Sequence, residues 1–306
     1  MTDITAPVQG NMPTSDEIIG ALRDAGWLLE QDTAATLSSN GFHTITAKAF
    51  PDPDDPNVSR EIDVHGYRSI YRDDDLTFTI GARVLAECKQ SSMPYVVVGR
   101  HANEYELERE RNEQVFCYPR VTTARIDLGG GRWKMQTTAA QKYLRLIDLP
   151  GSPWEGGFVG TQLTRLDRKK TWLADNRGIF TSLVYPLAKA VTYYRQQGKQ
   201  TAAHRPGQTW AHIEFMYPLV VTSAPVFSVD TAKDSPLEAA EVPWATITRE
   251  IKSKNIDGQF HIDVVTATAL GQYLDEHVRG FCDAVSRLAE SDPHRFITEE
   301  DQNFDQ

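Results

Sequence analysis

Hydrophobic and polar positions in the first hundred residues follow two different periods. Apolar residues recur at helical spacing over residues 15–37, directly after Thr14 and Ser15, either of which can cap a helix. Asn40-Gly41 then predicts the end of this helix. The runs that follow are short, β-branched or aromatic, and separated by turn residues, which predicts a sheet. They cover residues 43–50, 59–68, 76–81, 83–90 and 94–99, with an acidic, proline-rich loop at 51–57.

Less regular patterns occupy the middle of the chain. The charged segment 104–114 predicts a solvated helical face, and the triplet Gly129–Gly131 predicts a turn. A phosphate-binding loop is not expected at the glycines, because no GK[ST] follows and no strand–loop–helix pattern frames them. Residues 132–205 predict a mainly helical region, with its clearest helix at 180–197.

The last third of the chain predicts buried strands and a covering helix. Residues 212–230 have the unbroken apolar character of strands that are covered on both faces, and 244–254 and 260–268 predict further strands. Residues 270–290 predict an amphipathic helix that packs against the sheet. The apolar stripe of this helix comprises Leu270, Tyr273, Leu274, Val278, Phe281, Val285 and Leu288.

These patterns together predict a single elaborated α/β domain at residues 15–291. A polar arm broken by proline and glycine precedes it at 1–14, and a polar, acidic tail expected to be disordered follows at 292–306. Within the domain, the core is expected at 15–100 and 180–290, and residues from about 101 to 179 form an insertion.

The composition is that of a globular protein, and the sequence argues against a membrane protein, a secreted protein and a protein that coats nucleic acid. The 306 residues are 40% hydrophobic and 24% charged, and no run approaches the roughly 20 apolar residues of a membrane helix. The start lacks the pattern of a secretory signal, so a cytoplasmic location is expected. Cys88, Cys117 and Cys282 are odd in number and far apart, which predicts free thiols. The net charge of −10 counts against a protein that coats nucleic acid, although a local basic patch can still bind DNA.

Candidate chemistry centres on acid-x-Lys triplets, because a carboxylate and an ammonium two residues apart share one face of a strand. Two of the three triplets lack a suitable context. One is flanked by charge, which predicts an exposed turn or helix end, and another has no acid-bearing strand shortly before it. Only the triplet that begins at Glu87 lies in a hydrophobic strand preceded by a strand with an acid, Asp63. The triplets are Glu87-Cys88-Lys89, Asp167-Arg168-Lys169 and Glu250-Ile251-Lys252.

Strand alternation predicts how the two acids meet. Glu87 and Lys89 project from one face, and the Cys88 thiol points to the other, into the core. Pairing of this strand with the strand of Asp63 would put Asp63 and Glu87 on opposite sides of one hard cation, with the Cys88 backbone carbonyl as a further oxygen ligand. Magnesium is the expected ion. The arrangement suits phosphodiester hydrolysis, in which Lys89 would orient a water or balance charge on the phosphorane.

These residues resemble the PD-(D/E)xK superfamily, the restriction-endonuclease-like phosphodiesterases. The resemblance covers roughly residues 15–100, from the helix with Glu30 through the strand with Asp63 to the strand with Glu87-Cys88-Lys89. The helix and apolar strand at 180–230 would complete the core of that family. The resemblance implies a mixed sheet flanked by helices, with helical and strand elaborations.

The resemblance also implies the role of each residue. Asp63 and Glu87 would bind Mg²⁺, for which Mn²⁺ can substitute, Lys89 would assist the attacking water, and Glu30 is a candidate for the helix acid that some members carry. The substrate would be DNA, in restriction, antiviral defence or repair, and a homodimer or a defence-system partner protein is implied. The chain departs from the family motif immediately before Asp63, where it has Ile62 and the motif has proline. Two alternatives stay open: Glu17 for the helix acid, and Glu61 for Asp63 if the register differs by two.

Further residues have structural and functional interpretations. His65 shares the predicted face of Asp63, and a hydrogen-bonding structural role competes with proton transfer or phosphate contact. His212 and His261 are expected at solvent-facing strand positions. Two clusters that mix cations with aromatic rings could contact nucleic acid, although solvated helix faces explain them nearly as well. The nucleic-acid candidates are Arg168, Lys169, Lys170 and Arg195, and Arg165, Trp172, Arg177, Lys189, Tyr193, Tyr194 and Lys199 belong to the same clusters.

Two rival functions remain. One is a non-catalytic nucleic-acid-binding or protein-binding module in which Glu87 and Lys89 form only a salt bridge. The other is an interaction or immunity protein whose acidic surface binds a basic partner, which the net charge of −10 favours.

Overall fold

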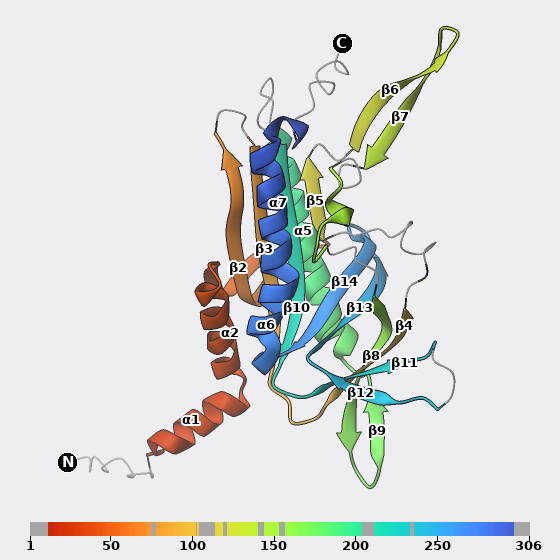
Figure 1. Cartoon of the computed structure of the whole chain (residues 1–306). Helices are drawn as coiled ribbons and strands as arrows, with labels where there is room; N and C mark the ends of the chain where they lie inside the picture. Colours follow the sequence, from red (N-terminus) through yellow and green to blue (C-terminus); the bar gives the residue numbers. More distant parts are fainter. Residues whose placement is uncertain are drawn as a thin grey trace, which may run out of the picture.

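A mixed β-sheet runs through the molecule, and helices cover both of its faces (Figure 1). The structure is a computed structural model that describes most of the chain. The described residues are 12–74, 78–101, 103, 114–118, 121–139, 144–152, 157–203, 211–232 and 236–296.

Two helices, not one, open the chain. Helix α1 (Ser15–Asp24) begins at a capping box between Thr14 and Glu17, and helix α2 (Trp27–Ser39) follows. The single helix predicted at 15–37 is therefore wrong. Gly26 adopts φ of +87°, a left-handed conformation that interrupts the helix and that glycine tolerates without a Cβ penalty.

Three antiparallel strands follow as a meander. They are β1 (His43–Pro51), β2 (Ser59–Asp73) and β3 (Phe78–Lys89), in which β1 pairs with β2 and β2 with β3. The runs predicted at 76–81 and 83–90 form one strand, β3, because its side chains stay buried through the intervening residue Ala82. Strand β4 (Tyr95–His101) comes next.

A second helix and strand unit packs onto this meander. The π-helical segment η2 (Phe180–Val184) leads into α5 (Tyr185–Ala203), and β10 (Ala211–Thr222) lies parallel to β3 from Ala211–Phe78 to Thr222–Lys89. Helix, three-strand meander, helix and parallel strand thus occur in that order. The predicted helix at 180–197 is confirmed, and of the buried strands predicted at 212–230 β10 is confirmed, whereas β11 (Val226–Asp230) is fully buried only at Val226.

The middle of the chain contains far more strand than predicted. Strands β6 (Val121–Gly129) and β7 (Arg132–Ala139) form a separate hairpin, and β8 (Phe158–Arg168) and β9 (Trp172–Asp175) form another. The mainly helical prediction for 132–205 is therefore wrong up to residue 175. Apolar and polar residues do alternate at 124–128 and 132–136, on either side of the glycine turn, so the two-residue period of a hairpin is present in this part of the sequence. The turn predicted at Gly129–Gly131 is confirmed by φ values of 77°, 63° and 75°. Residues 104–113 of the predicted charged helix lie outside the described residues.

The remaining strands complete the sheet. They are β5 (Val115–Tyr118), β11 (Val226–Asp230), β12 (Ala239–Val242), β13 (Trp244–Lys252) and β14 (Asp257–Thr266). Among the described residues twelve strands join in the order β1-β2-β3-β10-β14-β13-β8-β4-β11-β12, with β5 beside β10 and β9 beside β8. The predicted class, a mixed sheet flanked by helices, is confirmed, and β8 belongs to the main sheet although its segment was expected to be an insertion.

Two hydrophobic clusters lie on the two faces of the sheet. One packs under α2 and the C-terminal helix, and the other packs under α5. The C-terminal helix consists of α6 (Leu270–Tyr273), a π-helical segment η4 (Leu274–Arg279) and α7 (Gly280–Ser291). Its predicted apolar stripe faces the first cluster. Short 3₁₀ segments complete the helical elements: η1 (Leu146–Asp148), η3 (Ala267–Ala269) and η5 (Pro293–Phe296).

The start of the tail is ordered against the core. Phe296 is 4% exposed, and its ring stacks on Phe78 with centroids 4.8 Å apart. The predicted disorder after Asp292 is therefore wrong for Pro293–Phe296, because one aromatic side chain anchors this turn, and residues 297–306 lie outside the described residues. None of the helices in the described part of the chain is both long and apolar enough to cross a membrane.

Candidate functional site

The candidate site lies where strands β2 and β3 separate. Their antiparallel pairing extends toward the end of β3 and stops at Val64 and Ala86. Continued pairing would put Asp63 opposite Glu87, but the Asp63 carboxylate instead accepts a hydrogen bond from the backbone N–H of Cys88 at 2.7 Å. A side chain replaces a backbone acceptor at this point, and it fixes Asp63 beside the last residues of β3.

One ammonium group links the two acids. Lys89 Nζ donates a hydrogen bond to Glu87 Oε2 at 3.1 Å and lies 3.7 Å from Asp63 Oδ2. The side chains of Asp63 and Lys89 are 21% and 31% exposed, whereas that of Glu87 is 7% exposed. The structure thus brings together the three residues selected from the sequence, and solvent reaches them from the side of Asp63 and Lys89.

Burial and a neighbouring charge both disfavour ionisation of Glu87. Burial raises the pKa of Glu87, the charge of Asp63 raises it further, and Lys89 only partly opposes them, so this pKa is about 7. Burial would lower the pKa of Lys89, but the charges of Glu87 and Asp63 outweigh it and raise this pKa. Near neutral pH, Lys89 is therefore charged and Glu87 changes its protonation state. A perturbed acid beside a charged partner is typical of functional sites.

Helix α2 contributes to the site from the other side of β3. Glu30 lies in the first turn of α2, and burial followed by the charge of Asp63 raises its pKa. The Cys88 thiol points away from Glu87 and contacts Thr33 Oγ1 of α2 at 3.5 Å, as strand alternation predicts. Burial raises the pKa of Cys88 to about 12, so this thiol is a core group and not a nucleophile.

The residues that were alternatives to Glu30 and Asp63 lie elsewhere or are exposed. Glu17 lies in α1, where its carboxylate accepts hydrogen bonds from Thr14, and Glu61 is exposed on β2. His65 is buried, bonds to Arg83 and stacks on Tyr194 with ring centroids 5.2 Å apart. Burial and the charge of Arg83 lower the pKa of His65 to about 4, which favours its structural interpretation.

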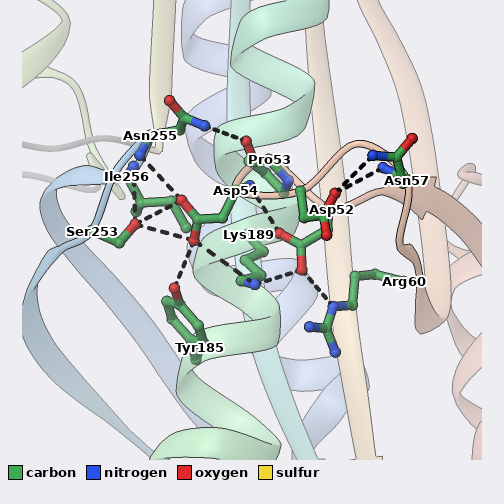
Figure 2. Close-up of polar contacts among 11 residues, drawn as sticks. Asp52, Pro53, Asp54, Asn57, Arg60, Tyr185, Lys189, Ser253, Asn255 and Ile256 are labelled. Atoms are coloured by element: carbon green, nitrogen blue, oxygen red, sulfur yellow. Dashed lines mark hydrogen bonds and ion pairs between the residues drawn. The ribbon is translucent and has the colours of Figure 1, made fainter.

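A second acid–lysine cluster was not found from the sequence (Figure 2). Lys189 of α5 donates a hydrogen bond to Asp52 Oδ2 at 2.6 Å and lies 3.8 Å from Asp54 Oδ2. Arg60 also donates to Asp52, and the Asp54 carboxylate accepts from Tyr185, Ser253 and the backbone of Asn255. This cluster ties the 51–57 loop, α5 and the turn between β13 and β14 together. The prediction that Lys189 lines a nucleic-acid groove is wrong, because its side chain is 6% exposed.

The two clusters differ in the direction in which the pKa of their acids is shifted. Burial alone would raise the pKa of Asp52, but hydrogen bonds from Lys189 and Arg60 outweigh it and hold this pKa at about 2. Hydrogen bonds likewise outweigh burial at Asp54 and lower its pKa. Hydrogen bonds thus stabilise the ionised form of both carboxylates, as expected of charged groups with a structural role. At the end of β3 the pKa of Glu87 is raised instead, so that its charge is only partly compensated.

The acid pair fits a hard divalent cation. Such a cation prefers carboxylate and carbonyl oxygens and keeps several waters, and a positive charge near Asp63 and Glu87 would relieve the repulsion that raises the pKa of Glu87. The described residues contain no group of three or more His, Cys, Asp or Glu side chains that could hold a metal ion.

The predicted nucleic-acid residues separate into exposed and half-buried positions. Arg168, Lys169 and Lys170 are exposed at the end of the β8–β9 hairpin. Arg195 is half-buried in α5, where burial lowers its pKa to about 10. The expectation that His212 and His261 face solvent is wrong. His212 bonds to Thr79 at 2.8 Å and is 14% exposed, and His261 is 7% exposed, because β10 and β14 are central strands.

Comparisons with protein-family models, curated proteins and solved structures find no match to this chain.

Proposed function

We propose that the protein is a Mg²⁺-dependent nuclease that hydrolyses DNA phosphodiester bonds at the end of strand β3. The convergence of Asp63 and Glu87 on the Lys89 ammonium carries this proposal, since the distances are 3.7 and 3.1 Å. Two acids that repel each other favour a cation, and an adjacent ammonium suits a reaction in which negative charge develops on a phosphate.

The order of elements supports the same proposal. The resemblance to the PD-(D/E)xK superfamily implies that a later helix and strand complete the core begun by residues 15–100. In this chain α5 covers one face of the meander, and β10 pairs in parallel with β3 along its whole length. Asp63 and Glu87 then occupy the adjacent strands β2 and β3, where the resemblance implies the metal-binding acids.

Each residue takes a distinct role in the proposed reaction. Asp63 and Glu87 would hold Mg²⁺ together with the Cys88 carbonyl, and the bound ion would supply positive charge against the scissile phosphate. Lys89 carries the permanent positive charge that would orient the attacking water and contact a phosphate oxygen. Glu30, in the first turn of α2, adds negative charge beside Asp63 and would orient water within the same site.

The test combines cleavage with a readout of metal binding. The wild-type chain is incubated with plasmid, linear and single-stranded DNA and with RNA, in Mg²⁺, Mn²⁺ or chelator. Asp63→Asn, Glu87→Gln and Lys89→Met should each lower cleavage by at least about 100-fold. Glu61→Gln is the matched control, because this exposed acid lies two residues before Asp63 on β2 and should retain activity.

Metal binding is measured separately by thermal denaturation with and without Mg²⁺. A ligand that binds only the folded state raises its stability, so Mg²⁺ should raise the melting temperature of the wild type and of Lys89→Met but not of Asp63→Asn. Full cleavage by all three variants would reject the assignment.

A non-catalytic nucleic-acid-binding module is the second candidate, and the ion pair between Glu87 and Lys89 at 3.1 Å is the observation that favours it. Such a module would bind DNA without cleaving it in any metal. The nuclease should lose cleavage on Lys89→Met and keep DNA binding, which separates the two candidates.

A further inference from the structure

The hairpin of β8 and β9 extends beyond the sheet, at the end of the molecule opposite the β6–β7 hairpin (Figure 1). Arg165 of β8 pairs with Tyr95, the first residue of β4. Tyr95 is 4% exposed, and the positive charges of Arg165 and Lys89 both act on its phenol, against the burial that raises its pKa. Backbone pairing thus joins the base of the hairpin to β4, the strand that follows β3 in the chain.

The charge of this hairpin is opposite to that of the whole chain. The segment 165–177 carries five cations and two carboxylates, whereas the complete chain has a net charge of −10. Arg177 neutralises Asp175 through paired contacts at 2.8 and 2.9 Å, which leaves Arg168, Lys169 and Lys170 as exposed cations around the turn. This positive surface is local, and it complements a polyanion.

An exposed aromatic ring lies among these cations. Trp172 is 52% exposed and the adjacent Leu173 is 46% exposed, although tryptophan is usually highly buried. The Arg168 guanidinium lies 5.5 Å from the centre of the Trp172 ring. Four residue pairs between β8 and β9 form one short ladder that pairs Arg168 with Trp172, and Lys169 and Lys170 lie between these two residues. A ring beside cations can stack on a base while the cations contact the flanking phosphates.

We propose, on the basis of the function proposed above, that this hairpin binds a single-stranded segment of the DNA substrate. Trp172 stacks on an unpaired base, and Arg168, Lys169 and Lys170 neutralise the phosphates on either side of it. The faces of paired bases are covered by their neighbours in a duplex, so the exposed ring selects unpaired nucleotides.

Binding is measured by fluorescence anisotropy with a labelled oligothymidylate, in chelator so that no cleavage occurs. Trp172→Ala should weaken binding by about tenfold, the loss expected from one stacked base, and Trp172→Phe should retain most of the affinity. Trp133→Ala is the matched control. Trp133 is 53% exposed on the β6–β7 hairpin, which projects from the opposite end of the molecule (Figure 1), and its replacement should not change binding.

Salt dependence tests the role of the cations. The double variant Lys169→Gln and Lys170→Gln should reduce the magnitude of the slope of log affinity against log salt concentration by about 1.4, because each phosphate contact to a single strand contributes about 0.7. A labelled duplex of the same length should bind more weakly than the single strand, and Trp172→Ala should not affect it. The same oligomer as RNA shows whether the surface prefers DNA.

The outcomes distinguish this proposal from the proposed function. Unchanged single-strand binding by Trp172→Ala, or an equal loss for Trp133→Ala, overturns the hairpin assignment even if the chain cleaves DNA. Equal binding of duplex and single strand overturns the selection of unpaired bases. Loss of binding on Trp172→Ala in a chain that cleaves nothing in Mg²⁺ or Mn²⁺ supports the hairpin surface and rejects the nuclease.

Discussion

Replacement of Glu87 by glutamine should stabilise the protein at high pH, although it should abolish the proposed activity. The pKa of Glu87 rises from its ordinary value of 4.5 to about 7 in the folded state. Between these values the folded protein keeps a proton that the unfolded chain has released, so stability falls as the pH rises through this window. At about 1.4 kcal/mol per pKa unit, the ionised side chain costs about 3 kcal/mol above pH 7.

Glutamine removes this cost because it has a similar shape and no charge. Its side-chain oxygen can still accept a hydrogen bond from Lys89, and the repulsion with Asp63 disappears. Glu87→Gln should therefore raise the free energy of unfolding by about 3 kcal/mol at pH 8 and by less than about 1 kcal/mol at pH 5, where the folded wild type is also neutral at this position.

Urea denaturation at pH 5 and pH 8 measures both values, with tryptophan fluorescence and circular dichroism as coincident probes. Glu61→Gln is the control, since Glu61 is exposed and its replacement should change stability by less than about 0.5 kcal/mol at either pH. A Glu87→Gln variant that is no more stable than the wild type at pH 8, or whose gain is the same at both pH values, would refute the account of a buried, repelled carboxylate.

The other predictions concern groups outside the acid pair. Lys189→Met should destabilise the protein by about 3–5 kcal/mol in urea denaturation, because it leaves the buried Asp52 carboxylate without its main partner. Arg60→Ala removes the half-exposed partner of Asp52 and should cost at most about 1 kcal/mol, and an equal loss for both variants would contradict this ranking. Burial raises the pKa of Cys88 and of Cys282 to about 12, so a thiol reagent at pH 8 should label both only after unfolding, and their rapid labelling in the native state would contradict it.

Alternation of side chains predicts which residues share a face at the candidate site. Glu87 and Lys89 lie on one face of a hydrophobic strand and Cys88 on the other, which follows from the two-residue period alone. The neighbouring strand with Asp63 was identified by the same period. The end of the β2–β3 pairing at Val64 was not predictable, because it depends on the hydrogen bond between the Asp63 carboxylate and the backbone of Cys88.

Sequence patterns failed where stabilisation comes from distant or polar contacts. Strand β8 pairs with β4 and β13 as well as with β9, and its leucines Leu163 and Leu166 are three residues apart, a spacing that does not indicate a strand. Lys189 and Asp52 are 137 positions apart, so neither residue type nor spacing indicates that they meet. The break between α1 and α2 depends on the left-handed conformation of Gly26, and a glycine within a helical pattern does not by itself specify such a break.

The two acid–lysine clusters show that charge compensation, and not residue type, separates a structural group from a candidate functional group. Asp52 receives hydrogen bonds from Lys189, Arg60 and the backbone of Asp54, and its pKa is held at about 2. Glu87 is buried, accepts a hydrogen bond from Lys89 and lies beside a second carboxylate, so its pKa is about 7. The first cluster gains stability from its charges over the whole physiological pH range. The second loses stability on ionisation, and a bound cation or a protonated state would relieve that cost. A site that is stabilised by an added positive charge is suited to bind one, which is why the end of β3, and not the 51–57 loop, is assigned the proposed chemistry.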